Sequence, residues 1–137
     1  MNTSEIEGLL LKKGVKPTPQ RMVIADYLLH TFSHPTADEV LAAVENKLPC
    51  ALSRATVYNT LNCLVQAGVI QEVFTEPGKA RYDANVSDHH HFVDKKSGRI
   101  LDIPAELVPK LSEQLGDKYK IHSYQVTFYG EFDEETQ

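Results

Sequence analysis

A change of sequence period near Gly68 constrains the fold more than any other feature of this chain. Before this glycine, the sequence repeats the signals that start helices: a hydroxyl side chain as N-cap, a proline in the first turn, or a glutamate three residues after the cap. The helices predicted from these signals are 5–13 after Ser4-x-x-Glu7, about 19–30 after Thr18-Pro19, one beginning after Thr36 in Thr36-x-x-Glu39, and 54–66 after Ser53. Apolar side chains recur at helical spacing, so we expect these helices to bury one face.

After Gly68 the pattern becomes that of strands. Residues 69–74 and 80–83 are predicted strands around the turn 76–79, which contains adjacent proline and glycine. Several helices followed by a two-stranded hairpin are typical of the winged-helix variant of the helix-turn-helix domain. We therefore predict a winged-helix DNA-binding domain over residues 1–84.

Residues 85–137 are predicted to form a second, smaller domain. Strands are expected at 89–94, 99–103 and 120–129, with a helix over 104–115 whose leucines share one face. Roughly 50 residues give only a thin core, so this sheet is expected to pair with a second copy in a homodimer. The predicted fold class is α+β, with an N-terminal winged helix-turn-helix domain followed by a small α/β dimerisation domain.

Five side chains of metal-binding types recur along the chain: His34, Asp83, His89, His91 and Asp102. His89 and His91 lie two residues apart on a predicted strand, so both imidazoles point to one face while His90 points to the other. Asp83 and Asp102 each end a predicted strand and lie outside any acidic run. The pattern predicts one divalent metal site; the alternative is a surface histidine tract without function.

The available ligand types restrict the metal. Cys50 and Cys63 are the 2 cysteines of the chain, too few and too widely spaced for a thiolate zinc site or a disulfide framework. Nitrogen and oxygen ligands suit Fe(II) or Mn(II), although Zn(II) competes for such sites. Two histidines and one aspartate also form the facial triad of non-haem iron oxygenases. Those enzymes usually hold the triad in a larger barrel, so we expect this chain not to be an enzyme.

The charge distribution limits where DNA could bind. The formal net charge is −5, with 8 basic and 9 acidic side chains in residues 1–85 and 6 basic and 10 acidic side chains in residues 86–137. Nucleic-acid-binding domains usually carry a basic patch. Any contact with DNA must therefore come from a local surface of the first half.

The predicted helix 54–66 provides such a surface. Its outer face is uncharged, and Asn59 can pair bidentately with adenine while small or aromatic groups touch a thymine methyl. The residues predicted to contact double-stranded DNA, through bases or phosphates, are Lys16, Arg21, Ser53, Arg54, Thr56, Tyr58 and Asn59. The alternative is an ordinary polar helix face; the hairpin that follows favours DNA.

No apolar run approaches the roughly 20 residues that cross a membrane. The sequence Met1-Asn2-Thr3-Ser4-Glu5 also lacks the basic and apolar regions of a secretory signal. We therefore predict no membrane association and a cytoplasmic location.

Several of these motifs occur together in one known family. They are 16–21 (Lys-Pro-Thr-Pro-Gln-Arg), 34–38 (His-Pro-Thr-Ala-Asp), 53–59 (Ser-Arg-Ala-Thr-Val-Tyr-Asn) and the Asp-His-His-His segment 88–91. In this order they resemble the ferric uptake regulator superfamily, especially its peroxide-sensing branch, over nearly the whole chain to Gly130. The resemblance implies a homodimeric, metal-activated repressor that binds an inverted-repeat DNA operator.

The resemblance also implies roles for the candidate ligands. The regulatory site of the peroxide-sensing branch corresponds to His34, Asp83, His89, His91 and Asp102, with peroxide oxidising His34 or His89 when Fe(II) is bound. Aspartate at position 102 favours this branch, because iron-uptake regulators usually have glutamate there. The alternative within the family is an iron-responsive repressor without peroxide sensing.

Two metal sites of the family depart from its pattern in this chain. A structural zinc commonly bound by two Cys-x-x-Cys pairs is not expected here, because Asp94 and Ser97 occupy the positions of the first pair and the tail has no cysteine. A second regulatory site near Asp88 and His90 is also incomplete, because Tyr124 replaces a histidine. We therefore expect Fe(II) or Mn(II) at one regulatory site per subunit and no structural zinc.

Overall fold

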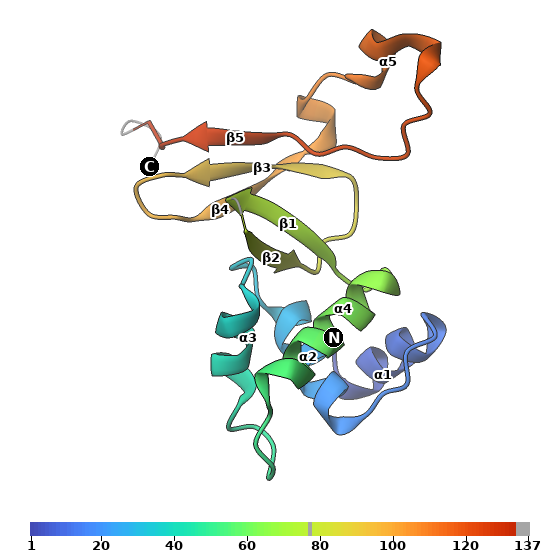
Figure 1. Cartoon of the computed structure of the whole chain (residues 1–137), viewed down its shortest axis with the longest axis vertical. Helices are drawn as coiled ribbons and strands as arrows, with labels where there is room; N and C mark the ends of the chain where they lie inside the picture. Colours follow the sequence, from blue (N-terminus) through green and yellow to red (C-terminus); the bar gives the residue numbers. More distant parts are fainter. Residues whose placement is uncertain (77, 134–137) are drawn as a thin grey trace. The chain divides into compact units, whose positions relative to one another are not determined.

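The structure is a computed structural model that describes residues 1–76 and 78–133. The chain divides into two compact units, Met1–Val86 and Ser87–Gln137. The first unit contains α1 (Thr3–Lys12), α2 (Pro19–His30), α3 (Ala37–Val44) and α4 (Arg54–Gln66), followed by the hairpin of β1 (Gln71–Glu76) and β2 (Lys79–Asp83) (Figure 1). This order of elements matches the pattern predicted for residues 1–84.

Three of the four predicted helix starts are confirmed. The side chains of Thr18, Thr36 and Ser53 each accept a hydrogen bond from the backbone three residues ahead. The predicted cap of the first helix at Ser4 is wrong, because α1 begins at Thr3 and its cap is Asn2. The Asn2 side chain accepts from the Glu5 backbone N–H at 2.9 Å, and the Glu5 carboxylate accepts from the Asn2 N–H at 3.3 Å. This reciprocal pair is a capping box, and it lies two residues before the box predicted at Ser4 and Glu7.

The core of the first unit is built by the inner faces of its helices. Its fully buried side chains include Ile6, Leu10, Ile24, Leu28, Val40, Val44, Val57, Leu61 and Leu64. Each of the four helices contributes at least two of them at helical spacing, as the apolar pattern predicts. The hairpin adds Tyr82 to the same cluster.

The hairpin is joined to the loop between α2 and α3. The Tyr82 N–H donates to the Pro35 carbonyl at 2.9 Å, and Thr36 forms an isolated antiparallel bridge with Arg81. Strands β1 and β2 are themselves antiparallel, with Gln71 opposite Asp83. These bonds place the end of β2 beside the residues that precede α3.

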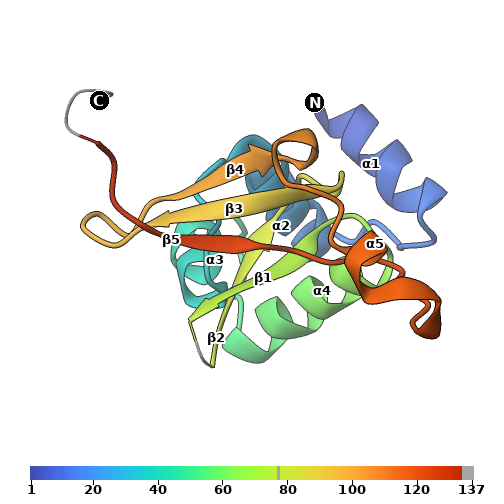
Figure 2. The same cartoon turned by 90° about the horizontal axis from the view of Figure 1, so that it is seen from above.

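The second unit is built on a three-stranded sheet in the order β4-β3-β5 (Figure 2). Strand β3 (His89–Asp94) pairs antiparallel with β4 (Ile100–Pro104) and parallel with β5 (Thr127–Gly130). His91 lies opposite Asp102 on one side and Thr127 on the other. The strands predicted at 89–94 and 99–103 are thus confirmed.

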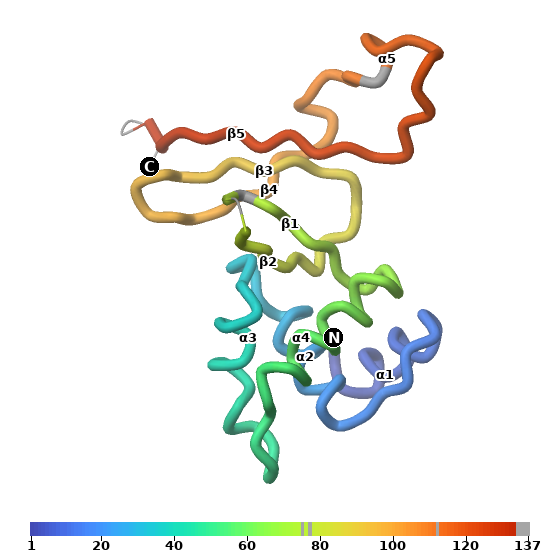
Figure 3. The backbone as a smooth tube through the Cα atoms, viewed as in Figure 1, coloured from blue at the N-terminus to red at the C-terminus, as the bar shows by residue number. Residues whose placement is uncertain are grey.

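The prediction of one helix over residues 104–115 is wrong. The segment forms a 3₁₀ turn η1 (Ala105–Leu107), the four-residue α5 (Ser112–Leu115) and a second turn η2 (Gly116–Lys118), which together loop out between β4 and β5 (Figure 3). Pro109 has no backbone N–H to donate within a helix, and Val108 before it is extended. The three leucines of the predicted apolar face, Leu107, Leu111 and Leu115, remain exposed.

The long strand predicted over 120–129 is also shorter than expected. Only Thr127–Gly130 is strand β5. Just before it, the Val126 N–H donates to the Nδ1 atom of His90 at 2.8 Å instead of to a strand carbonyl, while the Val126 carbonyl accepts from the His91 N–H at 3.0 Å. A side chain therefore replaces a backbone acceptor at the point where the ladder ends.

No helix within the described ranges 1–76 and 78–133 combines the length and apolar character needed to cross a membrane.

We predict that Leu61→Ala destabilises the first unit by roughly 2–5 kcal/mol, because the Leu61 side chain is fully buried and its removal leaves a cavity among packed helices. Denaturant unfolding followed by circular dichroism measures the loss. The exposed neighbour on the same helix, Asn62→Ala, should change stability by less than about 0.5 kcal/mol. Equal losses for the two variants would contradict the packing described for α4.

Candidate metal ligands and nucleic-acid surface

In the first unit, His34 and Asp83 form one pair of candidate ligands. The His34 Nε2 atom lies 3.3 Å from the Asp83 Oδ2 atom, and His34 is buried. The other carboxylate oxygen of Asp83 accepts the Asn85 N–H at 2.9 Å. The hairpin bonds to Pro35 bring these two residues together across 49 positions of sequence.

His34 has an unusual backbone conformation. Its φ angle is +52°, in the left-handed region that residues other than glycine rarely adopt. The Arg81 guanidinium donates to the His34 carbonyl at 3.1 Å and to the Glu39 carboxylate at 3.4 Å. The hydrogen bond from Arg81 to the His34 carbonyl helps to hold the His34 backbone in this strained conformation.

Arg81 and Glu39 support His34 without being candidate ligands themselves, and neither was predicted from the sequence. A signal for Arg81 exists, because it lies two residues before Asp83 and therefore shares its face of β2. Glu39 serves both the cap of α3 and Arg81. Burial alone would raise the pKa of Glu39, but hydrogen bonds from Thr36 and the positive charges of Arg81 and Lys79 outweigh that effect and lower it.

In the second unit, His89, His91 and Asp102 form a compact group. The Nε2 atoms of His89 and His91 lie 3.5 and 3.4 Å from the same Asp102 oxygen, Oδ1. The two imidazole rings meet edge to face, with centroids 4.7 Å apart. The alternation predicted for the strand therefore holds, and both predicted imidazoles face the predicted carboxylate.

A backbone contact fixes which nitrogen of His89 can bind a cation. The Nδ1 atom lies 2.6 Å from the Ser87 carbonyl, which can only accept a hydrogen bond. The proton of neutral His89 is therefore on Nδ1, and the lone pair is on Nε2, the atom that faces Asp102. Metal-binding histidines are commonly oriented by such a contact on their second nitrogen.

His90 has the opposite arrangement. Its Nδ1 atom accepts from the Val126 N–H, so the proton of the neutral ring is on Nε2. Burial and the neighbouring His89 and His91 lower the pKa of His90, which favours this neutral form. Because one nitrogen is occupied by a donor and the other carries a proton, His90 has no lone pair to offer a metal ion in this arrangement.

Tyr124 packs beside His90, with ring centroids 5.6 Å apart. Its hydroxyl accepts from the Leu111 N–H at 3.1 Å and donates to the Pro109 carbonyl at 3.3 Å. Asp88, His90 and Tyr124 line a cavity of about 800 Å³ in the second unit. The two hydrogen bonds of the Tyr124 hydroxyl therefore hold the backbone of residues 109–111 beside this cavity.

The turn between β3 and β4 is also closed by hydrogen bonds. Asp94 accepts from the Lys96 N–H at 3.0 Å and from the Ser97 hydroxyl at 2.7 Å, and its carbonyl accepts from the Gly98 N–H at 2.8 Å. The hydrogen bond from Ser97 is the largest of the effects that lower the pKa of Asp94. Asp94 and Ser97 occupy the positions where the family resemblance predicts the first Cys-x-x-Cys pair.

Predicted DNA-contact residues gather at the first unit's surface. Lys16, Arg21, Thr56 and Asn59 line one cavity of about 290 Å³, which Thr18, Gln20 and Thr60 complete. The Arg21 guanidinium donates to the Lys16 carbonyl at 3.0 Å, which holds the two basic residues together. Gln20, which directly precedes Arg21, also lines this cavity and is not among the residues predicted to contact DNA.

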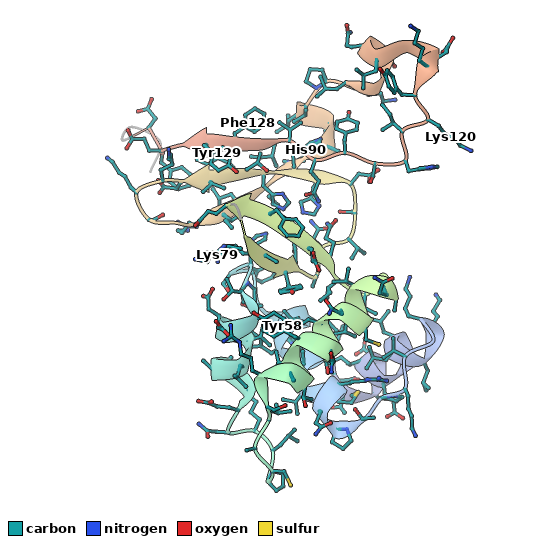
Figure 4. The ribbon with its side chains drawn as sticks, viewed as in Figure 1. Tyr58, Lys79, His90, Lys120, Phe128 and Tyr129 are labelled. Atoms are coloured by element: carbon teal, nitrogen blue, oxygen red, sulfur yellow. The ribbon has the colours of Figure 1, made fainter. Side chains whose placement is uncertain are left out.

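The other predicted contacts lie at the start of α4. The Ser53 hydroxyl caps the helix and lies 2.9 Å from the Thr56 hydroxyl. The Arg54 guanidinium lies over the Tyr58 ring at 5.6 Å, and both side chains are exposed. Figure 4 shows Tyr58 on α4, with its side chain at the surface of the helix. A hydrogen bond with Tyr58 and the charge of Asp38 raise the pKa of Arg54.

Comparison with known proteins identifies relatives of this chain. A peroxide-responsive repressor of Staphylococcus epidermidis is 35% identical over 124 residues, covering 88% of this chain and 81% of the relative. A peroxide operon regulator of Bacillus subtilis is 35% identical over 124 residues and is covered over 84% of its length.

Solved structures show the same fold. The ferric uptake regulator of Vibrio cholerae matches with a TM-score of 0.72 at 23% identity, covering 92% of this chain and 98% of that protein. A zinc-bound manganese uptake regulator matches with a TM-score of 0.67 at 27% identity, covering 91% and 96%. The predicted α+β fold class is thus confirmed.

The pattern that describes the Ferric uptake regulator family matches residues 12–129, most of the chain. The chain therefore belongs to the ferric uptake regulator family, whose members are transcription regulators and not enzymes.

Proposed function

We propose that this chain is a metal-dependent transcriptional repressor that senses hydrogen peroxide through oxidation of its histidine ligands. In this proposal a homodimer binds an inverted-repeat operator in double-stranded DNA and acts in the cytoplasm. The observation that carries the proposal is the geometry of the second unit, where two buried imidazoles face one Asp102 oxygen and the Ser87 carbonyl leaves the His89 lone pair directed there.

The ligand types support Fe(II) or Mn(II). His89, His91 and Asp102 provide two nitrogens and one carboxylate, and His34 with Asp83 provides a further pair of the same kind in the first unit. We propose that one ion is held by all five residues. Such an ion would couple the two units and favour the arrangement in which a dimer presents both α4 helices to the operator.

The proposal includes no structural zinc. The turn at Asp94 and Ser97 is closed by hydrogen bonds to the Asp94 carboxylate and carbonyl, and both cysteines of the chain lie in the first unit. Packing and hydrogen bonds are then expected to hold the dimer.

Bound Fe(II) would supply the electron that reduces hydrogen peroxide and generates an oxidant beside the imidazoles. His34 and His89 are the residues we expect to gain oxygen. Modification of either ring would weaken its nitrogen as a ligand, lower the affinity for the ion and release the repressor from DNA. An iron-responsive repressor without peroxide sensing is the second candidate, since the same ligands would bind Fe(II) without this oxidation.

We predict that His91→Ala abolishes Mn(II)-dependent DNA binding, whereas His90→Ala leaves it intact. Loss of contacts that only orient a ligand costs about 10- to 100-fold in metal affinity, so loss of a ligand itself should cost more. Calorimetric titration with Mn(II) and DNA-binding assays with and without chelator measure both effects. The opposite ranking of these adjacent histidines would refute the assignment of His91 as the ligand.

Peroxide sensing makes a prediction of its own. With Fe(II) bound, peroxide should release the protein from DNA and add about 16 Da per oxygen atom to peptides containing His34 or His89. With Mn(II) bound, the same dose should have little effect, because Mn(II) does not readily reduce peroxide. Mass spectrometry of the digested protein checks this outcome. Release of DNA with oxidation at Cys63 and unmodified histidines would move the sensing role to the thiol.

The surface cavity of the first unit generates a third test. Asn59→Ala should reduce discrimination between operator and random DNA by roughly 1–3 kcal/mol if Asn59 pairs with a base. Lys16→Ala, in the same cavity, should weaken binding to both DNAs and flatten the salt dependence. Operators can be selected from a random pool with the Mn(II)-loaded protein. Equal losses on the two DNAs for Asn59→Ala would assign it to backbone contact.

A further inference from the structure

The Arg54 guanidinium is already paired with a carboxylate of its own unit. Its Nε atom lies 3.2 Å from the Asp38 Oδ1 atom, and its Nη2 atom lies 3.3 Å from Oδ2. One edge of the guanidinium therefore meets both carboxylate oxygens, which is the bidentate geometry that arginine also uses with phosphate. The Cζ atom of the same group lies over the Tyr58 ring, 5.6 Å from its centroid.

The position of this pair matters because both residues stand at helix starts. Asp38 lies in the first turn of α3, and Arg54 is the first residue of α4, the helix predicted to contact DNA. Both side chains are about two-thirds exposed. A DNA phosphate that binds Arg54 must therefore approach the negative charge of Asp38, and it can use the Nε–Nη2 edge of the guanidinium only by taking the place of that carboxylate.

We propose that Asp38 competes with DNA phosphate for Arg54 and so lowers the affinity of this protein for DNA of any sequence. The inference rests on the proposed DNA-binding function and adds a residue that opposes it. Exposed ion pairs are weak, so a phosphate can displace Asp38 once the protein is correctly placed. The effect is independent of sequence because phosphate contacts carry no base information.

The size of the effect follows from the strength of such pairs. Removing the Asp38 charge should raise DNA affinity by about two- to fivefold for each subunit in contact. It should also steepen the dependence of log affinity on log salt by about 0.9 per subunit, because one more phosphate becomes fully neutralised. Operator and random DNA should gain by the same factor.

The test uses the full-length, Mn(II)-loaded protein and a short duplex of mixed sequence, followed by fluorescence anisotropy over a series of salt concentrations. Asp38→Asn should bind more tightly than the unchanged protein. Asp26→Asn is the matched control, because Asp26 is a half-exposed carboxylate of the same unit that lies beside His30 at 3.4 Å. It should change affinity by less than about twofold. Thermal unfolding by circular dichroism checks that each variant remains folded.

A double-mutant cycle shows whether Asp38 acts through Arg54. Arg54→Ala should weaken binding. Adding Asp38→Asn to Arg54→Ala should then produce no gain, because the guanidinium for which Asp38 and phosphate compete is absent. A gain that persists without Arg54, or weaker binding by Asp38→Asn, would overturn the inference while leaving DNA binding in place. If the unchanged protein binds neither this duplex nor a selected operator with any metal, the proposed function falls and the inference falls with it.

Discussion

Hydrogen bonds along strand β3 determine which of three adjacent histidines can bind a cation. The alternation of the strand turns His89 and His91 toward Asp102 and His90 toward Val126 and Tyr124. Alternation alone would leave the ring protons undecided. The Ser87 carbonyl places the His89 proton on Nδ1, whereas the Val126 N–H excludes a proton from Nδ1 of His90. One strand therefore has a face prepared for a cation and a face engaged in holding the fold.

The candidate pair of the first unit depends on long-range backbone contacts instead. His34 and Asp83 meet because the hairpin returns to the α2–α3 loop, where Tyr82 donates to Pro35 and Arg81 donates to His34. The left-handed backbone of His34 needs this support, because an isolated loop would relax to a more populated conformation. The Arg81 side chain therefore positions the candidate ligand His34 by binding the backbone carbonyl of His34, not its imidazole.

Much of this architecture is predictable from local sequence, and the failures have physical causes. Helix starts at Thr18, Thr36 and Ser53 and the shared face of His89 and His91 depend on short-range rules, so the sequence predicts them correctly. The segment between β4 and β5 does not follow them: the spacing of Leu107, Leu111 and Leu115 indicates a helix, but Pro109 interrupts it and the three leucines remain exposed. The strand before Thr127 ends early because His90 takes a hydrogen bond that a backbone carbonyl would otherwise receive, and no local pattern reveals that competition.

The acidic balance of the chain is compatible with a switch that acts on DNA. Two of the basic side chains in the first unit, Arg54 and Arg81, are paired with carboxylates, whereas Lys16 and Arg21 line the surface cavity. One subunit then offers few phosphate contacts, and its affinity alone is expected to be low at physiological salt. The affinity of two linked subunits for DNA exceeds that of one subunit strongly only if both can contact their half-sites at the same time. A metal ion that favours that arrangement can therefore control occupancy of the operator, whereas a strongly basic domain would bind DNA whether or not the ion was present.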